Sequence, residues 1–213
     1  MNALIQMGSA SVVLYAQWSA SSRSVIGYAY VANKNDNTVS QYTIGSNGAL
    51  TPMNSAAVAA GSEPDSVTVD PTGKYVYVAN NDSETISQYV IGVGGVLTGE
   101  GTVAAGFSPQ SVMVDPSGKY VYVANSGNGG TPSVSQYTIG ANGTLSSMTP
   151  ATVVAGTDPW AVTVDPSGKY VYVASGGTVS QYTIGSNGEL TPMATPTVAS
   201  GKGDACIVTT SIH

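Results

Sequence analysis

Charged residues and cysteine are scarce in this chain of 213 residues. Only 8% of the residues are charged, against roughly 25% in an average soluble protein. The net charge is −6, so we expect no nucleic-acid binding, which depends on Lys and Arg neutralising phosphates. The only cysteine, Cys206, cannot form an internal disulfide, and it excludes a zinc site built from several thiolates.

Long apolar runs are also missing. No stretch approaches the roughly 18 consecutive apolar residues that would predict a membrane-spanning helix. Residues 1–18 lack the basic start of a signal peptide, so we interpret residues 1–24 as an N-terminal segment that could supply a closing strand. The low charge and the abundance of Ser, Thr, Gly and Asn favour an extracytoplasmic or secreted bacterial or archaeal protein.

The inventory for nucleophilic catalysis is equally short. The only histidine is His213, the last residue, which is poorly placed to be held as a general base. There is no G-x-S-x-G motif, so a Ser-His-Asp triad is not expected, and no catalytic residue is assigned. A carboxylate that activates water remains compatible with the composition.

Repetition is what the chain has in abundance. The segment 66–80, SVTVDPTGKYVYVAN, returns at 111–125 and at 161–175. Its apolar and aromatic residues alternate with polar or smaller ones, which predicts two strands. Between them, Asp-Pro-Thr-Gly is typical of a type I turn, so Asp70, Asp115 and Asp165 are interpreted as turn-forming residues.

Each repeat continues with a third and a fourth predicted strand. The third carries the signature V-S-Q-Y or I-S-Q-Y, and a Gly-rich turn joins it to the fourth. The repeats are about 45 residues long, a period typical of propeller blades. We therefore predict an all-β protein, a β-propeller of about four four-stranded antiparallel blades. The twelve tyrosines of the second and third strands are expected to pack between the blades.

The repeat boundaries define the domain organisation. The predicted repeats span 25–65, 66–110, 111–160 and 161–204, and 205–212 reads as one more inner strand. In the second repeat, the strands are expected at 66–70, 74–79, 84–91 and 96–105, in this order from the centre outward. Residues 205–212 could complete the first blade, join an N-terminal strand, or pair with another chain, which would cause self-association.

The pattern D-P-[ST]-G-K-Y-V-Y-V-A-N followed by V-S-Q-Y resembles the YVTN repeat of bacterial and archaeal surface-layer and secreted propellers. It is also similar to blades of the 6-phosphogluconolactonase-like lactonase family. The resemblance covers about residues 25–210 and implies a propeller fold and a lactonase-like activity. Members of that family usually have about seven blades, so four repeats imply either a fragment or assembly with further copies.

One rim of the predicted propeller concentrates the negative charge. In an antiparallel blade, the connections from the fourth strand to the next first strand share a rim with those from the second strand to the third. This rim receives the following charged residues: Asp36, Glu63, Asp65, Asp82, Glu84, Asp158, Asp204, Lys34 and Lys202. Because binding residues are often on loops held by a rigid scaffold, we take this rim as the candidate surface.

The predicted ligand-binding residues are the acidic and aromatic side chains of the rim loops that differ between repeats. They are Glu63, Asp65, Asp82, Glu84, Phe107, Gln110, Asp158, Trp160 and Asp204. Phe107 and Trp160 could stack on a sugar ring or fill the mouth of the channel. The expected partner is a small molecule, a carbohydrate or a protein.

No cofactor is expected, and no metal ligand is assigned. Two loops, 33–37 and 81–84, offer oxygen atoms of the kind that calcium prefers, but neither has the spacing of an EF-hand. The main functional hypothesis is a binding or surface-interaction module that uses the acidic rim. The alternative is a lactonase-like hydrolase of a neutral lactone or ester, because the rim has too few cations for a phosphate.

Overall fold

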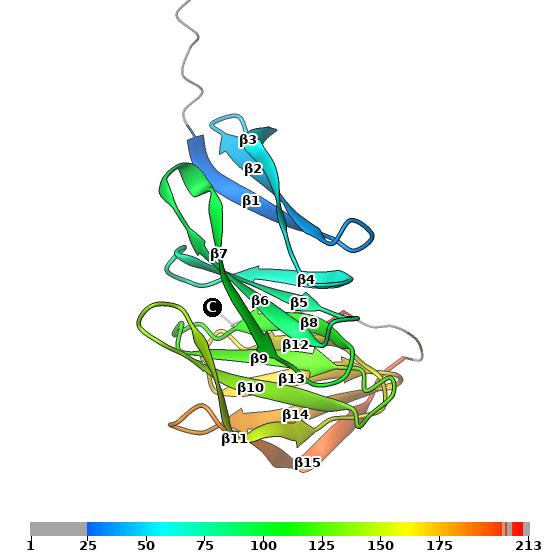
Figure 1. The fold of residues 1–213 in the computed structure, drawn as a ribbon. Helices are drawn as coiled ribbons and strands as arrows, with labels where there is room; N and C mark the ends of the chain where they lie inside the picture. Colours follow the sequence, from blue (N-terminus) through cyan, green and yellow to red (C-terminus); the bar gives the residue numbers. More distant parts are fainter. Residues whose placement is uncertain (1–24, 202, 204–205, 211–213) are drawn as a thin grey trace, which may run out of the picture.

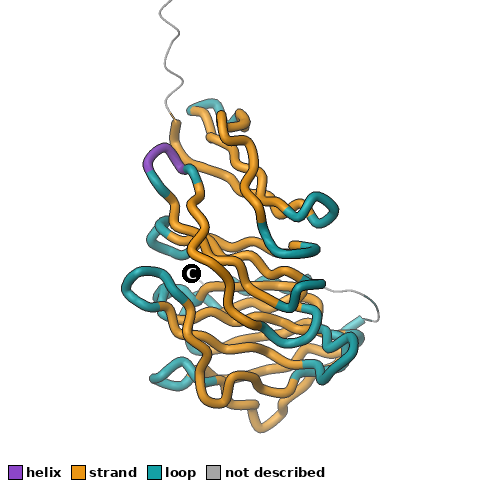
Figure 2. The backbone as a smooth tube through the Cα atoms, in the orientation of Figure 1, coloured by secondary structure: helices purple, strands orange, loops and turns teal. Residues whose placement is uncertain are grey.

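The computed structural model describes residues 25–201, 203 and 206–210. The predicted role of residues 1–24 as a closing strand therefore lies outside the described residues, and so does the assignment of Asp204 to the rim. The described chain consists of antiparallel sheets stacked one on the next, joined by turns (Figures 1 and 2). Its only helical element is the short 3-10 turn η1 (Val93–Gly95).

The four sheets follow the four repeats, and we call them blades 1 to 4. Blade 1 contains β1 (Val25–Asn33), β2 (Thr38–Gly45) and β3 (Leu50–Ala59). Blade 2 contains β4 (Pro64–Val69), β5 (Tyr75–Asn80), β6 (Thr85–Ile91) and β7 (Leu97–Ala104). Blade 3 contains β8 (Pro109–Val114), β9 (Tyr120–Asn125), β10 (Ser133–Ile139) and β11 (Leu145–Val154). Blade 4 contains β12 (Pro159–Val164), β13 (Tyr170–Ser175), β14 (Thr178–Ile184) and β15 (Leu190–Ala199).

The predicted all-β propeller architecture is confirmed, and the strands of blade 2 lie within two residues of their expected bounds. In blades 2 to 4 the strands are hydrogen-bonded in sequence order, from the inner strand to the outer one. Blade 1 differs, since it has three strands in the described part of the chain. Its sequence lacks the Asp-Pro-Thr-Gly turn that precedes the second strand in the other blades, and β1 is the first described strand of this blade.

The repeated hairpin turn has the expected chemistry. Asp70 accepts hydrogen bonds from the backbone amides of Thr72, Lys74 and Tyr75, and its carbonyl accepts one from the Gly73 amide. Asp115 and Asp165 repeat this pattern in blades 3 and 4. The carboxylate thereby satisfies amides that the short turn leaves without backbone partners.

The core lies between the blades rather than inside any one of them. The interface of blades 2 and 3 buries Tyr77 and Ile86 against Val121, Val123 and Tyr137. The interface of blades 3 and 4 repeats this cluster with Tyr122 and Val134 at the corresponding positions. The prediction that the tyrosines pack between blades is confirmed at these interfaces, since Tyr77 and Tyr122 are fully buried.

The blades form an open row in which blades 1 and 4 lie at opposite ends (Figure 1). The inner strands β4, β8 and β12 stand next to one another along it. Of the predicted closing strand 205–212, residues 206–210 are described, and they have no strand conformation. Thr209 donates a 3.1 Å hydrogen bond to the carbonyl of Val164 at the end of β12, so this segment lies beside the inner strand of blade 4.

Candidate functional site

The loops of one rim are held together by backbone hydrogen bonds, as the antiparallel order requires. The amide of Asn81, after β5, donates to the carbonyl of Glu63, before β4. In blade 3 the amides of Ser126 and Gly127 donate in the same way to Ser108 and Phe107. Each loop between a second and a third strand is thus fixed against the loop that leads into the first strand of the same blade, and side chains from both loops share one surface.

Lys34 neutralises part of the acidic rim. Its ammonium group lies 3.0 Å from the carboxylate of Asp65 and 3.4 Å from that of Glu63. The hydrogen bond to Asp65 is the main reason that the pKa of Lys34 is raised above its ordinary value. Two of the predicted binding carboxylates are therefore occupied in an ion-pair cluster between blades 1 and 2, which makes them less available to a ligand.

A pocket of about 480 Å³ opens at this rim where blades 2, 3 and 4 meet. It brings together three of the predicted residues, Gln110, Asp158 and Trp160. The remaining lining residues are Asn81, Ser108, Ser126, Gly127 and Asn128. The pocket therefore combines one carboxylate, several amides and hydroxyls, and one large aromatic side chain, and no lysine or arginine lines it.

Hydrogen bonds hold the polar wall of this pocket in place. The side-chain amide of Gln110 donates to the Ser126 hydroxyl at 3.3 Å, and that hydroxyl donates to the Ser108 carbonyl, also at 3.3 Å. The indole nitrogen of Trp160 is buried and has no hydrogen-bond partner among the described residues. Indole nitrogens usually find a partner when buried, so this donor is a buried polar group without a described partner.

The backbone at the pocket is strained. Ser108 and Asp158 have φ values of 52° and 55°, in the left-handed region that non-glycine residues rarely adopt. Each of these residues directly precedes the proline that begins an inner strand, and Glu63 occupies the same position in blade 2 with φ 51°. Two residues in this position, Ser108 and Asp158, line the pocket.

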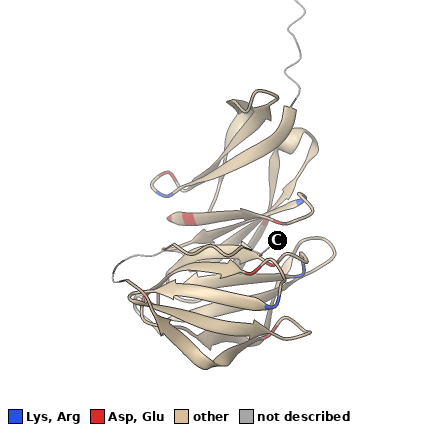
Figure 3. Cartoon of the chain, turned by 180° about the vertical axis from the view of Figure 1, so that it is seen from behind, with Lys and Arg blue, Asp and Glu red and all other residues tan. Residues whose placement is uncertain are grey.

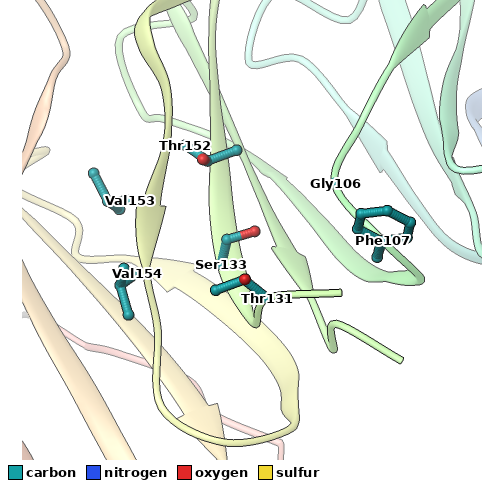
Figure 4. A pocket seen from close by; sticks show the side chains of 7 residues that line it. All are labelled: Gly106, Phe107, Thr131, Ser133, Thr152, Val153 and Val154. Atoms are coloured by element: carbon teal, nitrogen blue, oxygen red, sulfur yellow. The ribbon is translucent and has the colours of Figure 1, made fainter. Parts of the chain in front are cut away.

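Phe107 lies in a different depression. It lines a pocket of about 300 Å³ with Thr131, Ser133 and the end of β11, from Thr152 to Val154 (Figure 4). Its ring packs on the backbone of Gly130, where an added Cβ would come within 2.1 Å of the ring. Phe107 and Trp160, both considered as residues that could stack on a sugar ring, therefore line different pockets.

The remaining predicted residues do not line the main pocket. Asp82 and Glu84 are exposed in the loop between β5 and β6, and Asp204 lies outside the described residues. The residues that sequence reasoning missed are Asn81, Ser108, Ser126 and Asn128. A signal existed for Asn81 and Ser126, because both directly follow the repeated V-A-N at the end of a second strand, where the residue varies between repeats.

The two loops proposed as oxygen donors for calcium use some of their side chains structurally. The Asn37 side-chain oxygen accepts the Glu63 amide, and the Asn33 side-chain amide donates to Thr38 and Ser40. No group of three or more His, Cys, Asp or Glu side chains that could hold a metal occurs in the described part of the chain. Likewise, no described helix is long and apolar enough to cross a membrane.

Charged residues lie mainly in the loops and at strand ends (Figure 3). At the rim opposite the pocket, burial by itself would raise the pKa of Asp70. Hydrogen bonds from the Thr72 hydroxyl and from the amides of Tyr75, Lys74 and Thr72 outweigh burial and lower the pKa below its ordinary value. The carboxylate of Asp70 thus forms part of the hairpin turn, whereas the pocket residue Asp158 is exposed.

The sheet order, the stacked blades and the pocketed loop rim together define a protein of the β-propeller class. Within this class, the chain belongs to the family described as Lactonase, 7-bladed beta-propeller, whose model matches residues 22–93 and 81–205. The predicted resemblance to lactonase propellers is therefore confirmed. No curated protein matches the chain significantly.

Solved structures of similar fold include two bacterial proteins. One is a candidate 6-phosphogluconolactonase of Bacteroides fragilis, with 23% identity, a TM-score of 0.73, and coverage of 84% of this chain and 53% of that one. Another is the periplasmic gluconolactonase PpgL of Pseudomonas aeruginosa, with 18% identity, a TM-score of 0.71, and coverage of 84% and 52%. This chain therefore spans about half the length of either protein.

The comparisons favour the lactonase-like alternative over the acidic-rim binding module. They give the binding module no support, and the ion pairs of Lys34 remove part of the charge on which that hypothesis depended. The pocket at blades 2 to 4 is accordingly the better candidate site.

Proposed function

We propose that this chain carries the site of a lactonase-type hydrolase that opens a neutral lactone in the pocket between blades 2, 3 and 4. One observation carries the proposal. In a chain of the lactonase propeller family, Asp158 and Trp160 from the start of blade 4 and Gln110 from the start of blade 3 line one pocket of about 480 Å³. That volume lies within the usual range of small-molecule sites, roughly 300–1,000 Å³.

The residues of the pocket suit hydrolysis by water. The Asp158 carboxylate takes a proton from a water molecule as the water oxygen bonds to the acyl carbon of the lactone. The ring C–O bond then breaks, and the proton held by Asp158 passes to the leaving ring oxygen. The product is an open-chain hydroxy acid, and atoms and charges balance without a further reactant.

Neighbouring side chains would bind and orient the ring. The amide groups of Asn81 and Asn128 can donate hydrogen bonds to the carbonyl oxygen, on which negative charge develops during attack. The indole of Trp160 offers an apolar face for the sugar ring. The Ser126 hydroxyl is tied to Gln110 and Ser108 and no histidine lines the pocket, so we assign it no nucleophilic role.

The charge of the pocket favours an uncharged substrate. A phosphate monoester carries close to two negative charges. No cation lines the pocket, and Lys34 is already paired with Glu63 and Asp65. A neutral aldonolactone avoids the repulsion by Asp158. The solved propeller PpgL is described as a gluconolactonase, which supports this choice.

We also propose an extracytoplasmic location. The low charge and the content of Ser, Thr, Gly and Asn support it. So does the description of the Pseudomonas aeruginosa protein as periplasmic.

The test is the hydrolysis of gluconolactone by the purified chain, followed by acid release in a weakly buffered solution and corrected for spontaneous opening. We expect catalysed opening of gluconolactone, and little of a phosphorylated aldonolactone. Asp158→Asn keeps the shape and tolerates the left-handed backbone, and it should lower the catalysed rate at least about 100-fold. Glu189→Gln, on the opposite rim, is the control and should leave the rate unchanged. Equal rates for Asp158→Asn and the unchanged chain would refute the proposal.

A further inference from the structure

Neighbouring blades are joined by the same set of hydrogen bonds at every interface of the row. A tyrosine of the second strand donates to a glycine carbonyl of the next blade, in the pairs Tyr30–Gly95, Tyr77–Gly143 and Tyr122–Gly188. A glutamine of the third strand accepts a leucine amide of the next blade, in the pairs Gln41–Leu97, Gln88–Leu145 and Gln136–Leu190. Each blade therefore has a tyrosine-glutamine face and a glycine-leucine face.

The two ends of the row expose one face of each kind. Blade 4 ends with the tyrosine-glutamine face, where Tyr172 and Gln181 hold the positions of Tyr122 and Gln136. Blade 1 ends with the glycine-leucine face, where Gly48 and Leu50 hold the positions of Gly188 and Leu190. Leu50 is 54% exposed, whereas Leu97, Leu145 and Leu190 are 4%, 7% and 5% exposed.

Other positions of the repeat show the same contrast. Val31 is 44% exposed, while Val78, Val123 and Val173 at its position are fully buried. An added Cβ would meet a tyrosine ring at 2.2 Å at Gly95 and Gly143 and at 2.3 Å at Gly188, whereas it would meet nothing within 4 Å at Gly48. The two end faces thus carry the residues of a buried interface between blades, but no blade packs against them in the described part of the chain.

A missing strand and a surplus one complement each other. Blade 1 lacks an inner strand in the described chain, whereas residues 206–209, Cys-Ile-Val-Thr, align in the repeat with Ser66–Val69 of β4. Thr209 already donates to the Val164 carbonyl of the inner strand β12. The segment therefore stands where the inner strand of a following blade would stand.

We propose that a second copy of this chain supplies the following blade. Blade 1 of that copy packs against blade 4, and residues 206–210 of the first chain become its inner strand, so that the composite blade has four strands. Because the two faces differ, the contact is head to tail and closes into a ring when the rotation fits. Two chains provide twice four sheets, and propellers of eight blades are within the usual range.

The match between the faces favours a copy of this chain over an unrelated partner. Tyr172 would donate to the carbonyl of Gly48, and Gln181 would accept the amide of Leu50, as at the three interfaces within the chain. Tyr42, at the position of Tyr89, would donate to Ala199, as Tyr89 donates to Ala59. The proposed interface lacks one bond that the others have. In the Ser66–Val112 and Ser111–Val162 pairs, the serine hydroxyl accepts the amide of the neighbouring inner strand, but blade 4 has Ala161 at this position.

The mass of the intact chain in solution tests the assembly. Light scattering during size exclusion should give twice 21.4 kDa. Leu50→Arg places a charge in the proposed interface at a site exposed in the single chain, and it should give 21.4 kDa with unchanged circular dichroism. Val93→Arg is the matched control, because Val93 is fully exposed in η1, away from both end faces. A single-chain mass for the unchanged protein, or no effect of Leu50→Arg, would overturn the proposal.

A disulfide test identifies which chain supplies the inner strand. Ser66 pairs with Ala79, Ser111 with Ala124 and Ala161 with Ala174, so the composite blade pairs Cys206 with Ala32. Cys206 is the only cysteine and is exposed. Under mild oxidation, Ala32→Cys should give a two-chain species on a non-reducing denaturing gel, and Val93→Cys should not.

The other outcomes of this test contradict the proposal. A bond formed within one chain would mean that residues 206–210 close their own blade 1. A ladder of higher species would mean that the chains add end to end without closing a ring. Absence of any bond, with Cys206 still reactive toward a thiol reagent, would mean that the composite blade does not form.

Discussion

The phenol of Tyr77 donates a 2.7 Å hydrogen bond to the carbonyl of Gly143, across the boundary between blades 2 and 3. Tyr77 is fully buried. Because the two atoms belong to different sheets, this bond fixes how one blade sits on the next, and it does not stabilise either sheet by itself. Burial is the main reason that the pKa of Tyr77 is raised, so the hydroxyl remains a donor.

Tyr77→Phe should lower the free energy of unfolding by about 1–3 kcal/mol, because it leaves the buried Gly143 carbonyl without its partner. Tyr75→Phe is the matched control in the same strand. Its hydroxyl makes an exposed 3.2 Å bond to Ala141, which water can replace, so we expect a loss below about 0.5 kcal/mol. Urea unfolding of both variants makes the comparison. Equal losses would mean that the buried bond is not a joint between blades.

Gly143→Ala should be more destabilising than Gly48→Ala. Both glycines have positive φ, 84° and 78°, so both substitutions carry a backbone cost of about 1 kcal/mol. Only at Gly143 would the added Cβ lie 2.2 Å from the Tyr75 ring, which adds roughly 1–3 kcal/mol of overpacking. Thermal unfolding should give Gly143→Ala a clearly lower midpoint temperature than Gly48→Ala. This comparison is best made in the Leu50→Arg background, which removes the proposed interface at Gly48.

The architecture could be predicted from the sequence because the same residues recur in each blade. The Asp-Pro-Thr-Gly turn and the flanking Val and Tyr residues specify a hairpin through local geometry, as the hydrogen bonds of Asp70 show. The pairing of loops at the rim then followed from the antiparallel strand order. The three described strands of blade 1 agree with the missing hairpin turn before Tyr30, which is why residues 205–212 were considered as a strand that could complete the first blade.

The candidate site was only partly predictable, because charge was the signal used to find it. Lys34 reaches across to Asp65 from another blade, a contact that no spacing within one repeat reveals. The pocket is instead lined mostly by neutral groups such as Asn81 and Ser126, which resemble ordinary loop residues in sequence. Asp158 and Trp160 were found because their loop departs from the repeat.

Acid should destabilise the fold through the hairpin carboxylates. The pKa of Asp70 is lowered, and so is that of Asp165, because their hydrogen bonds outweigh the opposing effect of burial. A folded pKa below the unfolded one adds stability above the unfolded pKa of about 4, and this is lost as the pH falls through the folded pKa. Urea midpoints between about pH 5 and pH 2 should fall, and less steeply in Asp70→Asn. A parallel fall in both proteins would contradict the assignment.

Alkali should destabilise the fold through the buried tyrosines. Burial raises the pKa of Tyr137 to about 12, against a smaller opposing effect of Ser135. The ordinary pKa of tyrosine is about 10. The stability is thus complete below about pH 10 and declines as the pH rises from about 10 to 12, because the unfolded chain releases protons first. Tyrosinate absorbance should show that part of the tyrosines, Tyr137 among them, titrates above pH 10. Titration of every tyrosine near pH 10 without unfolding would contradict the burial.

Trp160 offers a way to separate binding from turnover in the pocket. The chain has two tryptophans, Trp18 and Trp160, so Trp18→Phe leaves the pocket indole as the sole reporter of fluorescence. In that background, gluconolactone should change the emission, and Asp158→Asn should keep this change while the rate of opening falls. Trp160→Phe, assayed for turnover, should raise KM less than Trp160→Ala, for which the loss of stacking predicts roughly a tenfold increase. If Asp158→Asn abolished the emission change together with turnover, the carboxylate would be needed to bind the lactone, and its role as the base that activates water would lose its support.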